Sequence, residues 1–357
     1  MLDLGCSPRH YGRVAEGRWS IGPHLSGVRS LMSSPQVPSD DGIVESFVHQ
    51  TPAEQQHERV SGVMNALPDQ GAASGDGSSP AGPVDPQAPQ PFGAPQYAST
   101  RPVPRVLAVA NQKGGVGKTT TAVNLGASLA DLGFRTLVVD LDPQGNATTG
   151  LGINARDVAS SIYDVLLNDA SMEHTIEPTS LKNLFVAPAN LDLAGAEIEL
   201  VAAFSRELRL KRAIDSVQAD YDFVLIDCPP SLGLLTINAF AAATEVLVPI
   251  QCEYYALEGL GQLIRNVELV RKSLNPSLEV TTLILTMYDA RTKLADQVVD
   301  EVQAHFGNKV CRQIVPRNVR LSEAPSFGQP IIVFDPLSRG AQAYQALAVE
   351  VSGGAAA

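Results

Sequence analysis

One short segment combines glycines, lysines and threonines in an order that suits phosphate binding. It reads, in chain order, Lys113, Gly114, Gly115, Val116, Gly117, Lys118, Thr119 and Thr120. Glycines allow successive backbone N–H groups to point at one anion, and a helix N-terminus adds positive potential there. Lys118 could reach the β and γ phosphates of a nucleotide, and the Thr119 hydroxyl is a suitable ligand for Mg²⁺. The segment therefore predicts a site for a nucleoside triphosphate with Mg²⁺.

The surroundings of this segment fit a phosphate-binding loop, although its start departs from the common pattern. It follows an apolar run and opens a helical pattern, which is the context that such loops require. Gln112 stands where the G-x-x-x-x-G-K-T pattern has its first glycine, and Lys113 adds a second lysine beside it. A glycine-rich turn without a ligand is the alternative, but packing gives no reason for two lysines and a pair of threonines. We therefore expect the whole segment to contact a nucleotide.

Two apolar runs end in carboxylates that are suited to organising Mg²⁺. Residues 136–140 end in Asp140, with Asp142 two positions later, and residues 223–227 end in Asp227. Ligands of α/β proteins bind at the carboxyl ends of parallel strands, where an acidic side chain can hold Mg²⁺ through a water molecule. We therefore expect Asp227 to be a metal ligand. For Asp140, a structural role and direct participation in catalysis remain equally open.

Alternating apolar runs and helical patterns must position these residues. The runs are continuously apolar, which is typical of parallel strands that are buried on both faces. Segments with apolar residues at helical spacing separate them. The sequence therefore predicts an α/β fold, a parallel twisted sheet with helices on both faces. The expected strands are residues 106–110, 136–140, 223–227, 246–250 and 280–287, and the clearest helices are residues 118–132, 257–274 and 340–351.

Composition divides the chain into an extension and a folded part. Twelve of the 25 prolines precede residue 101, together with runs of Gly, Ser and Gln. Such a stretch buries too little apolar surface to offset the entropy of ordering, so we expect residues 1–103 to be disordered. Residues 104–351 are long enough for one sizeable core, and residues 352–357 should be a flexible C-terminus. The net charge of −12 argues against a general polyanion binder, although part of the excess lies in the extension.

The cysteines and the hydropathy pattern exclude several classes of protein. Cys6, Cys228, Cys252 and Cys311 stand far apart without C-x-x-C spacing, which favours neither a disulfide framework nor a zinc site. No apolar run reaches the length of a membrane span, and the N-terminus lacks a signal-peptide pattern. We therefore expect a cytoplasmic protein that has no membrane partner.

The additional lysine of the phosphate loop, Lys113, points to a resemblance to a known protein family. The order K-G-G-V-G-K-T resembles the deviant Walker motif of the ParA/MinD superfamily of P-loop ATPases. Two further segments, L-T-M-Y-D-A-R ending at Arg291 and I-V-P-R-N-V-R-L-S-E-A-P-S-F-G starting at Ile314, resemble the ParA (Soj) branch, which partitions chromosomes. The resemblance spans residues 106–349 and includes all three nucleotide motifs. It implies an ATPase that uses ATP and Mg²⁺.

The resemblance also assigns roles to individual residues. Lys113 would cross a dimer interface to the phosphates bound by the other subunit, where a cation neutralises charge on the transferring phosphoryl group. Asp142 would orient the attacking water and complete the Mg²⁺ shell, so that Lys113, Lys118, Asp142 and Asp227 form the expected catalytic set. The remaining implied contacts are Pro316 and Asn318 with adenine, and Arg291 and Arg320 with DNA phosphates.

A working cycle follows from the same resemblance. ATP would join two copies into a homodimer, and the dimer would bind double-stranded DNA of the nucleoid without sequence preference. A ParB-type centromere-binding protein would then stimulate ATP hydrolysis and release the dimer. Arginines suit this task because they form bidentate hydrogen bonds with phosphate. The implied outcome is the segregation of chromosomal origins.

Other members of the superfamily remain alternatives. A plasmid-partition ATPase would share the motifs. A MinD-like membrane-cycling ATPase of the division site would need a basic amphipathic C-terminal helix, whereas residues 340–351 contain no Lys or Arg. An iron–sulfur carrier would need cysteines that meet across a dimer, and Cys228 has no suitable second cysteine near it in the sequence.

Overall fold

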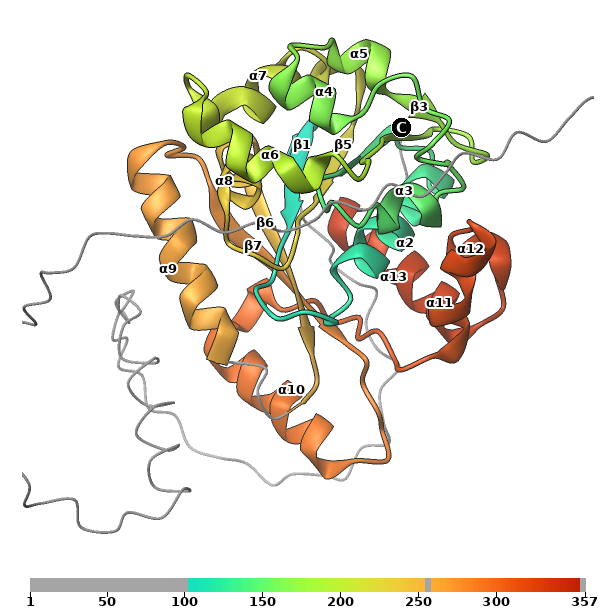
Figure 1. Cartoon of the computed structure of the whole chain (residues 1–357). Coiled ribbons are helices and arrows are strands. Elements are labelled where there is room, and N and C mark those ends of the chain that lie inside the picture. Colours follow the sequence, from blue (N-terminus) through green and yellow to red (C-terminus); the bar gives the residue numbers. More distant parts are fainter. Residues whose placement is uncertain (1–101, 254–257, 354–357) are drawn as a thin grey trace, which may run out of the picture. The chain divides into compact units, whose positions relative to one another are not determined.

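The described part of the chain is built on one seven-stranded sheet (Figure 1). The computed structural model describes residues 102–253 and 258–353. The strands of this part lie in the order β3, β4, β2, β5, β1, β6, β7, and all neighbours are parallel except β3 and β4, which are antiparallel. The parallel sheet is confirmed, and an antiparallel edge is added to it. The strands are β1 Arg105–Val109, β2 Thr136–Asp140, β3 Glu177–Pro178, β4 Leu184–Ala187, β5 Phe223–Asp227, β6 Glu245–Gln251 and β7 Glu279–Thr286.

Helices cover both faces of this sheet, as predicted. On β1, Val106 and Ala108 belong to one apolar cluster and Leu107 and Val109 to the other, because successive side chains of a strand point to opposite faces. Each cluster is closed by its own helices. The first face is covered by α4 Ile162–Leu167, α5 Met172–Thr175, α6 Leu193–Glu199, α7 Arg209–Asp215, α8 Leu234–Ala242, α9 Glu258–Ser273 and α10 Lys293–Phe306, and the second by α2 Lys118–Asp131, α3 Asn146–Gly150, α11 Val319–Glu323, α12 Ile331–Phe334 and α13 Arg339–Ser352.

The predicted domain, residues 104–351, lies within the described residues except for residues 254–257. The predicted disordered extension lies outside them, apart from Pro102 and Val103, which are exposed and belong to no helix or strand. At the other end, α13 includes Ser352, so the last helix runs one residue beyond the predicted domain boundary. Residues 354–357 of the predicted flexible C-terminus lie outside the described part.

Helix α2 approaches the sheet closely at Gly126. A Cβ atom at this position would stand 2.9 Å from Cγ2 of Val138 on β2 and 3.3 Å from Cδ1 of Leu225 on β5. Both distances are shorter than ordinary van der Waals contact, so any larger residue would push the helix and the sheet apart. The absence of a side chain here therefore sets the separation between α2 and the two central strands.

Two buried polar contacts fix α2 to the C-terminal helices. Asn124 Oδ1 accepts a hydrogen bond from the backbone N–H of Ile331, at the start of α12, at 2.7 Å. The hydroxyls of Thr121 and Tyr344 lie 3.1 Å apart between α2 and α13. The apolar side of α13 is buried in the same cluster, so this helix packs against the rest of the fold. The helix that starts at the phosphate loop is thus held from both the sheet and the C-terminal elements.

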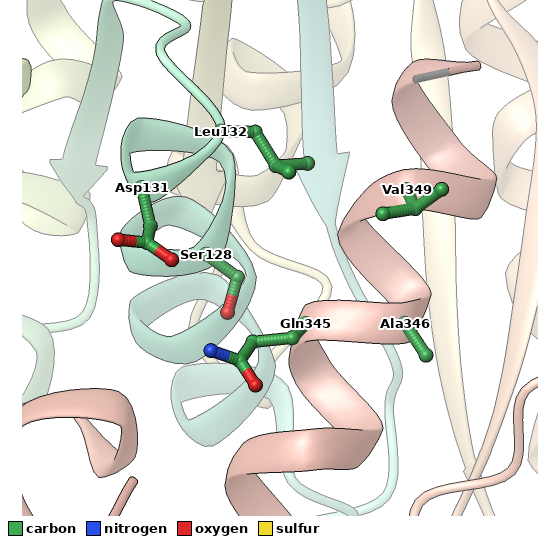
Figure 2. Close-up of a pocket in the computed structure, with 6 residues that line it drawn as sticks. All are labelled: Ser128, Asp131, Leu132, Gln345, Ala346 and Val349. Atoms are coloured by element: carbon green, nitrogen blue, oxygen red, sulfur yellow. The ribbon is translucent and has the colours of Figure 1, made fainter. Parts of the chain in front are cut away.

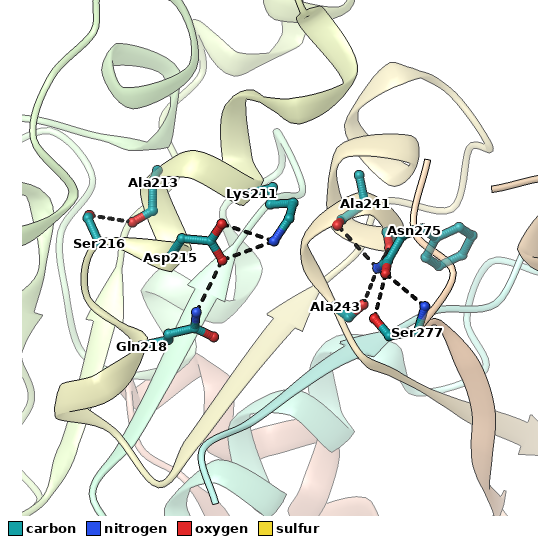
Figure 3. A network of polar contacts seen from close by, with 10 residues as sticks. Lys211, Ala213, Asp215, Ser216, Gln218, Ala241, Ala243, Asn275 and Ser277 are labelled. Carbon is teal, nitrogen blue, oxygen red and sulfur yellow. Dashed lines mark hydrogen bonds and ion pairs between the residues drawn. The ribbon is translucent and has the colours of Figure 1, made fainter. Parts of the chain in front are cut away.

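A buried amide fixes the connection between α8 and β6. Nδ2 of Asn275 donates hydrogen bonds to the carbonyl oxygens of Phe240, Ala241 and Ala243 at 2.9, 3.2 and 2.6 Å, and its Oδ1 accepts from Ser277 (Figure 3). The last carbonyls of a helix have no partner within the helix. The Asn275 amide satisfies them and so fixes the place where β6 begins.

Candidate nucleotide site

The carboxyl ends of three adjacent strands meet at the predicted phosphate loop. Strand β5 lies between β1 and β2, and Asp227 is in register with Val109 on one side and with Asp140 on the other. The chain leaves β1, passes through residues 110–117 and enters α2 at Lys118. The fold therefore brings the loop together with Asp140 and with Asp227, and Asp227 lies more than 100 residues away in the sequence.

The loop has the backbone conformation that an anion site requires. Gly115 and Gly117 have φ angles of 74° and 91°, in the left-handed region that favours glycine. Val116 is buried, and its carbonyl oxygen accepts a hydrogen bond from the Thr286 hydroxyl at the end of β7 at 2.9 Å. The N-cap residue of α2 is Gly117, which has no side chain that could cap the helix. Its first N–H groups are therefore left for a phosphate.

Lys118 is held inside the loop. Its side chain is buried, and Nζ donates a hydrogen bond to the carbonyl oxygen of Lys113 at 3.2 Å. Burial lowers the pKa of Lys118, and the negative charge of Asp227 opposes this shift. A buried ammonium group is stabilised by an added negative charge. The position of Lys118 therefore suits a phosphate group in the loop.

Asp227 is a fully buried carboxylate that accepts no hydrogen bond from the described part of the chain. Among the described residues, none donates to its Oδ1 or Oδ2. Burial raises the pKa of Asp227 well above its ordinary value, and the charge of Asp140 raises it further. The nearby Thr119 side chain acts in the opposite direction and lowers this pKa. A buried carboxylate is costly unless a cation or a donor compensates its charge. The residues present here therefore fit a Mg²⁺ ion beside the phosphate loop.

Asp140, in contrast, is fully satisfied by the protein. Its Oδ1 accepts a hydrogen bond from the Asp142 N–H at 3.2 Å, and its Oδ2 accepts from the N–H and hydroxyl of Thr148 at 2.7 and 2.6 Å. Burial raises the pKa of Asp140 to about 6 against the effect of these hydrogen bonds. Because Thr148 lies in α3, the carboxylate joins β2 to that helix. Of the two roles left open by the sequence, the structural one fits this geometry.

Asp142 lies in the turn between β2 and α3. Its Oδ1 accepts a hydrogen bond from the Gln144 N–H at 3.0 Å, and its side chain is mostly buried. Its charge acts on the pKa of both Lys118 and Asp227, so the three groups share one site. Asp142 thus remains available to a metal ion or a water molecule near the loop.

Lys113 stands at the start of the loop with neighbours that sequence reasoning missed. Its backbone N–H donates to Asn111 Oδ1 at 3.0 Å, and Asn111 Nδ2 donates to the carbonyl oxygen of Pro249 on β6 at 2.8 Å. Its Nζ lies 3.9 Å from Oε2 of Glu253. Asn111 could have been identified as a site residue from the sequence, because it is a polar residue that directly follows an apolar strand. Glu253 lies too far along the chain for any spacing to connect it with Lys113.

The segment expected to contact adenine runs beside the carboxyl end of β7. Pro316 and Tyr288 form a parallel bridge, and the Tyr288 N–H donates to the carbonyl oxygen of Val315 at 3.1 Å. Asn318 caps α11, because its Oδ1 accepts a hydrogen bond from the Arg320 N–H at 2.8 Å. The segment lies at the same edge of the sheet as the phosphate loop, so it is placed on the correct side for a bound base.

The two arginines expected to contact DNA lie on separate elements and are already paired. Arg291, between β7 and α10, is 85% exposed at its side chain and donates to Asp289 at 2.8 and 2.6 Å. Arg320, on α11, donates to Asp335 at 2.8 Å and to Glu323 at 2.7 Å. DNA phosphates would therefore have to compete with carboxylates of the protein for both side chains.

A cavity of about 300 Å³ lies between α2 and α13, away from the phosphate loop (Figure 2). Ser128, which lines it, stands about 15 Å along the helix from Lys118 at a rise of about 1.5 Å per residue. The cavity is therefore separate from the nucleotide site. Its lining consists of Ser128, Asp131, Leu132, Gln345, Ala346 and Val349.

Comparisons with known proteins agree with this geometry. A family model described as AAA domain matches residues 104–280. The sporulation initiation inhibitor protein Soj of Bacillus subtilis (strain 168) is 59% identical over 248 residues, which are 70% of this chain and 98% of that protein. The chromosome partitioning protein ParA of Myxococcus xanthus (strain DK1622) is 55% identical over 249 residues, which are 70% of this chain and 88% of that protein.

A solved structure from Mycobacterium smegmatis, named cobyrinic acid a,c-diamide synthase and bound to an ATP analogue and magnesium, is 41% identical. Its TM-score is 0.60, over 69% of this chain and 93% of that one. Among the helices of residues 102–253 and 258–353, none is long and apolar enough to cross a membrane. Identity of 59% over nearly the whole of Soj exceeds what a shared fold requires, and the chain belongs to the ParA (Soj) family of chromosome-partitioning ATPases.

Proposed function

We propose that this chain is an ATP-driven switch, whose ATP-bound homodimer holds DNA without reading its sequence and releases it after hydrolysis. The observation that best supports ATPase activity is the buried carboxylate of Asp227, which has no hydrogen-bond partner within residues 102–253 and 258–353 and lies beside a phosphate loop with two lysines. The Myxococcus xanthus relative that is named as a chromosome partitioning protein is 55% identical, against 41% for the structure named as a synthase. This order favours partitioning over the synthase activity.

The work of hydrolysis divides among the residues of the site. Lys118 and the N–H groups at the start of α2 hold the β and γ phosphates of ATP. When bound, Mg²⁺ neutralises charge on the phosphates, and Thr119, Asp142 and Asp227 would hold it. Asp142 also orients the attacking water. Lys113 reaches the phosphates bound by the second subunit, so that dimerisation completes each site.

The output of the cycle is DNA binding. Arg291 and Arg320 are both exposed, and each would exchange its carboxylate partners for DNA phosphates. Contacts with the DNA backbone give binding that ignores sequence and weakens with salt. A ParB-type centromere-binding protein would stimulate hydrolysis and release the dimer. The protein would thus work in the cytoplasm, on the nucleoid, and move chromosomal origins.

A sedimentation experiment tests this function. The full chain is sedimented with double-stranded DNA of random sequence in the presence of ATP, ADP or no nucleotide, at low and moderate salt. We expect the protein to bind DNA in the presence of ATP, but not with ADP or without nucleotide. Arg320→Ala should weaken it about tenfold and lower the slope of log affinity against log salt by about 2 per dimer, one for each lost phosphate contact.

Arg271→Ala is the matched control for charge. Arg271, on α9, makes an i,i+3 ion pair with Glu268, as Arg320 does with Glu323, and is similarly exposed at 45% against 47%. The control should bind DNA like the wild type. Equal binding with ADP and ATP, or equal losses in the two variants, would remove the DNA switch from the proposal and leave only the ATPase.

A further inference from the structure

The carboxylate of Glu253 is the meeting point of three segments of the nucleotide site. Its Oε1 accepts hydrogen bonds from Gln251 Nε2 at 2.6 Å and from Arg317 Nη2 at 3.2 Å. Its Oε2 lies 3.9 Å from Lys113 Nζ. Gln251 ends β6, Arg317 lies between Pro316 and Asn318, and Lys113 begins the phosphate loop. One acidic group thus links the phosphate side of the site to its expected adenine side.

The Glu253 carboxylate is held more firmly by Gln251 and Arg317 than by Lys113. Gln251 and Arg317 both bind Oε1, which leaves Oε2 directed at the phosphate loop. The backbone of Lys113 is fixed separately, through Asn111, to β6. The N–H of Lys113 is therefore held, through Asn111, to β6, and its ammonium group lies near Glu253, two residues after the end of β6 in the same subunit. In this geometry the lysine is held in cis.

The ion pair is nevertheless easy to break. The side chains of Lys113 and Glu253 are 36% and 45% exposed, and ion pairs of this exposure are weak because solvent screens them. A triphosphate offers Lys113 more negative charge and stronger charge-assisted hydrogen bonds than one carboxylate does. The pair can thus hold the lysine while no phosphate from a second subunit is near, and release it when one arrives.

We infer that Glu253 is a positioning residue that holds Lys113 at its own subunit and so sets how much ATP is needed for dimerisation. The inference rests on the proposed function, because it requires that Lys113 acts on the phosphates of a second subunit. Removal of the Glu253 charge should release the lysine and favour the dimer. The effect is small in energy, but it has a definite sign.

Glu253→Gln isolates this contact. A glutamine keeps a carbonyl oxygen to accept from Gln251 and Arg317, and it loses the charge that attracts Lys113. We expect the concentration of a non-hydrolysable ATP analogue at half-maximal dimer formation, measured by analytical ultracentrifugation of the full chain, to fall about two- to fivefold. The difference should vanish at 1 M salt, where the Debye length is about 3 Å. Reaction of the Lys113 amine with an acylating reagent, followed by mass spectrometry without nucleotide, should become faster.

Glu268→Gln is the matched control. Glu268 is 41% exposed and pairs with Arg271 on α9, so it removes the same charge from a pair that does not involve Lys113. It should leave dimerisation and the Lys113 labelling rate unchanged. If Glu253→Gln leaves both unchanged, shifts dimerisation no more than the control, or raises the analogue concentration required, the inference is wrong. If the wild-type chain forms no dimer with the analogue, the proposed function fails first, and the inference fails with it.

Discussion

Replacing Asp227 with Asn is expected to stabilise the metal-free protein and to abolish magnesium-dependent ATP hydrolysis. Because folding raises the pKa of Asp227, its stability contribution is present below the ordinary aspartate pKa and lost as the pH rises through the higher folded value. At neutral pH the charge therefore costs stability, which the neutral amide avoids. We expect a higher Tm in EDTA, by about 2 to 4 °C for each kcal/mol recovered. Hydrolysis should fall at least about a hundredfold, since the Mg²⁺ that would neutralise charge on the phosphates loses one of its carboxylates.

Asp140→Asn provides the matched comparison for this prediction. Asp140 is the register partner of Asp227, and both are fully buried. However, three donors already satisfy the Asp140 carboxylate, and an amide would turn its own N–H groups toward one of them. This variant should lose stability in calorimetry at neutral pH. Equal losses in the two variants, or wild-type hydrolysis after Asp227→Asn, would show that Asp227 has no role in metal binding.

Lys113→Ala is expected to abolish hydrolysis in a way that a second inactive variant can rescue. A cation supplied in trans to a transferring phosphoryl group contributes about 10³- to 10⁵-fold to the rate. In a mixed dimer, the subunit with Lys113→Ala keeps Lys118 and Asp227 and receives Lys113 from a subunit with Asp227→Asn. Mixing the two inactive variants in equal amounts should restore about one quarter of the wild-type rate, since half of the dimers are mixed and each has one complete site.

Single-turnover hydrolysis of each variant, alone and mixed, measures this rescue. The mixture of Asp227→Asn with Lys118→Ala serves as a control, because the two residues belong to the same site and the mixed dimer contains no complete one. No rescue in the first mixture would place Lys113 in its own subunit's site and remove the trans role. Rescue in both mixtures would show that the recovered hydrolysis does not depend on Lys113 acting in trans.

The central part of the fold could be predicted because its signals are local. The strands of residues 136–140 and 223–227 were predicted to the residue, since each is a continuous apolar run that ends in an aspartate. Strands β3 and β4 were missed, because two and four residues at the edge of a sheet carry little apolar signal. The short helices between β2 and β5 were missed for the same reason.

The candidate site was predictable in its residues but not in its contacts. The sequence placed Lys118 and Asp227 in one site because both follow strands of a parallel sheet. It left the role of Asp140 open, since nothing in the local sequence shows that Thr148 would satisfy the carboxylate. It also gave no sign that Arg320 would lie between Asp335 and Glu323. Such contacts depend on how distant segments pack, and the residue types alone do not encode them.

Gly126 determines how closely α2 can pack on the sheet, and so it affects the geometry of the whole site. Helix α2 carries Lys118 at its start, and β5 carries Asp227 at its end, so a change in the clearance between helix and sheet would also move these two charges relative to each other. A single methyl group at Gly126 would force a retreat of about half an ångström to reach ordinary contact with Val138. Displacements of this order are enough to slow catalysis. Gly126, which lies outside the phosphate loop, therefore helps to keep Lys118 and Asp227 at the distance that catalysis needs.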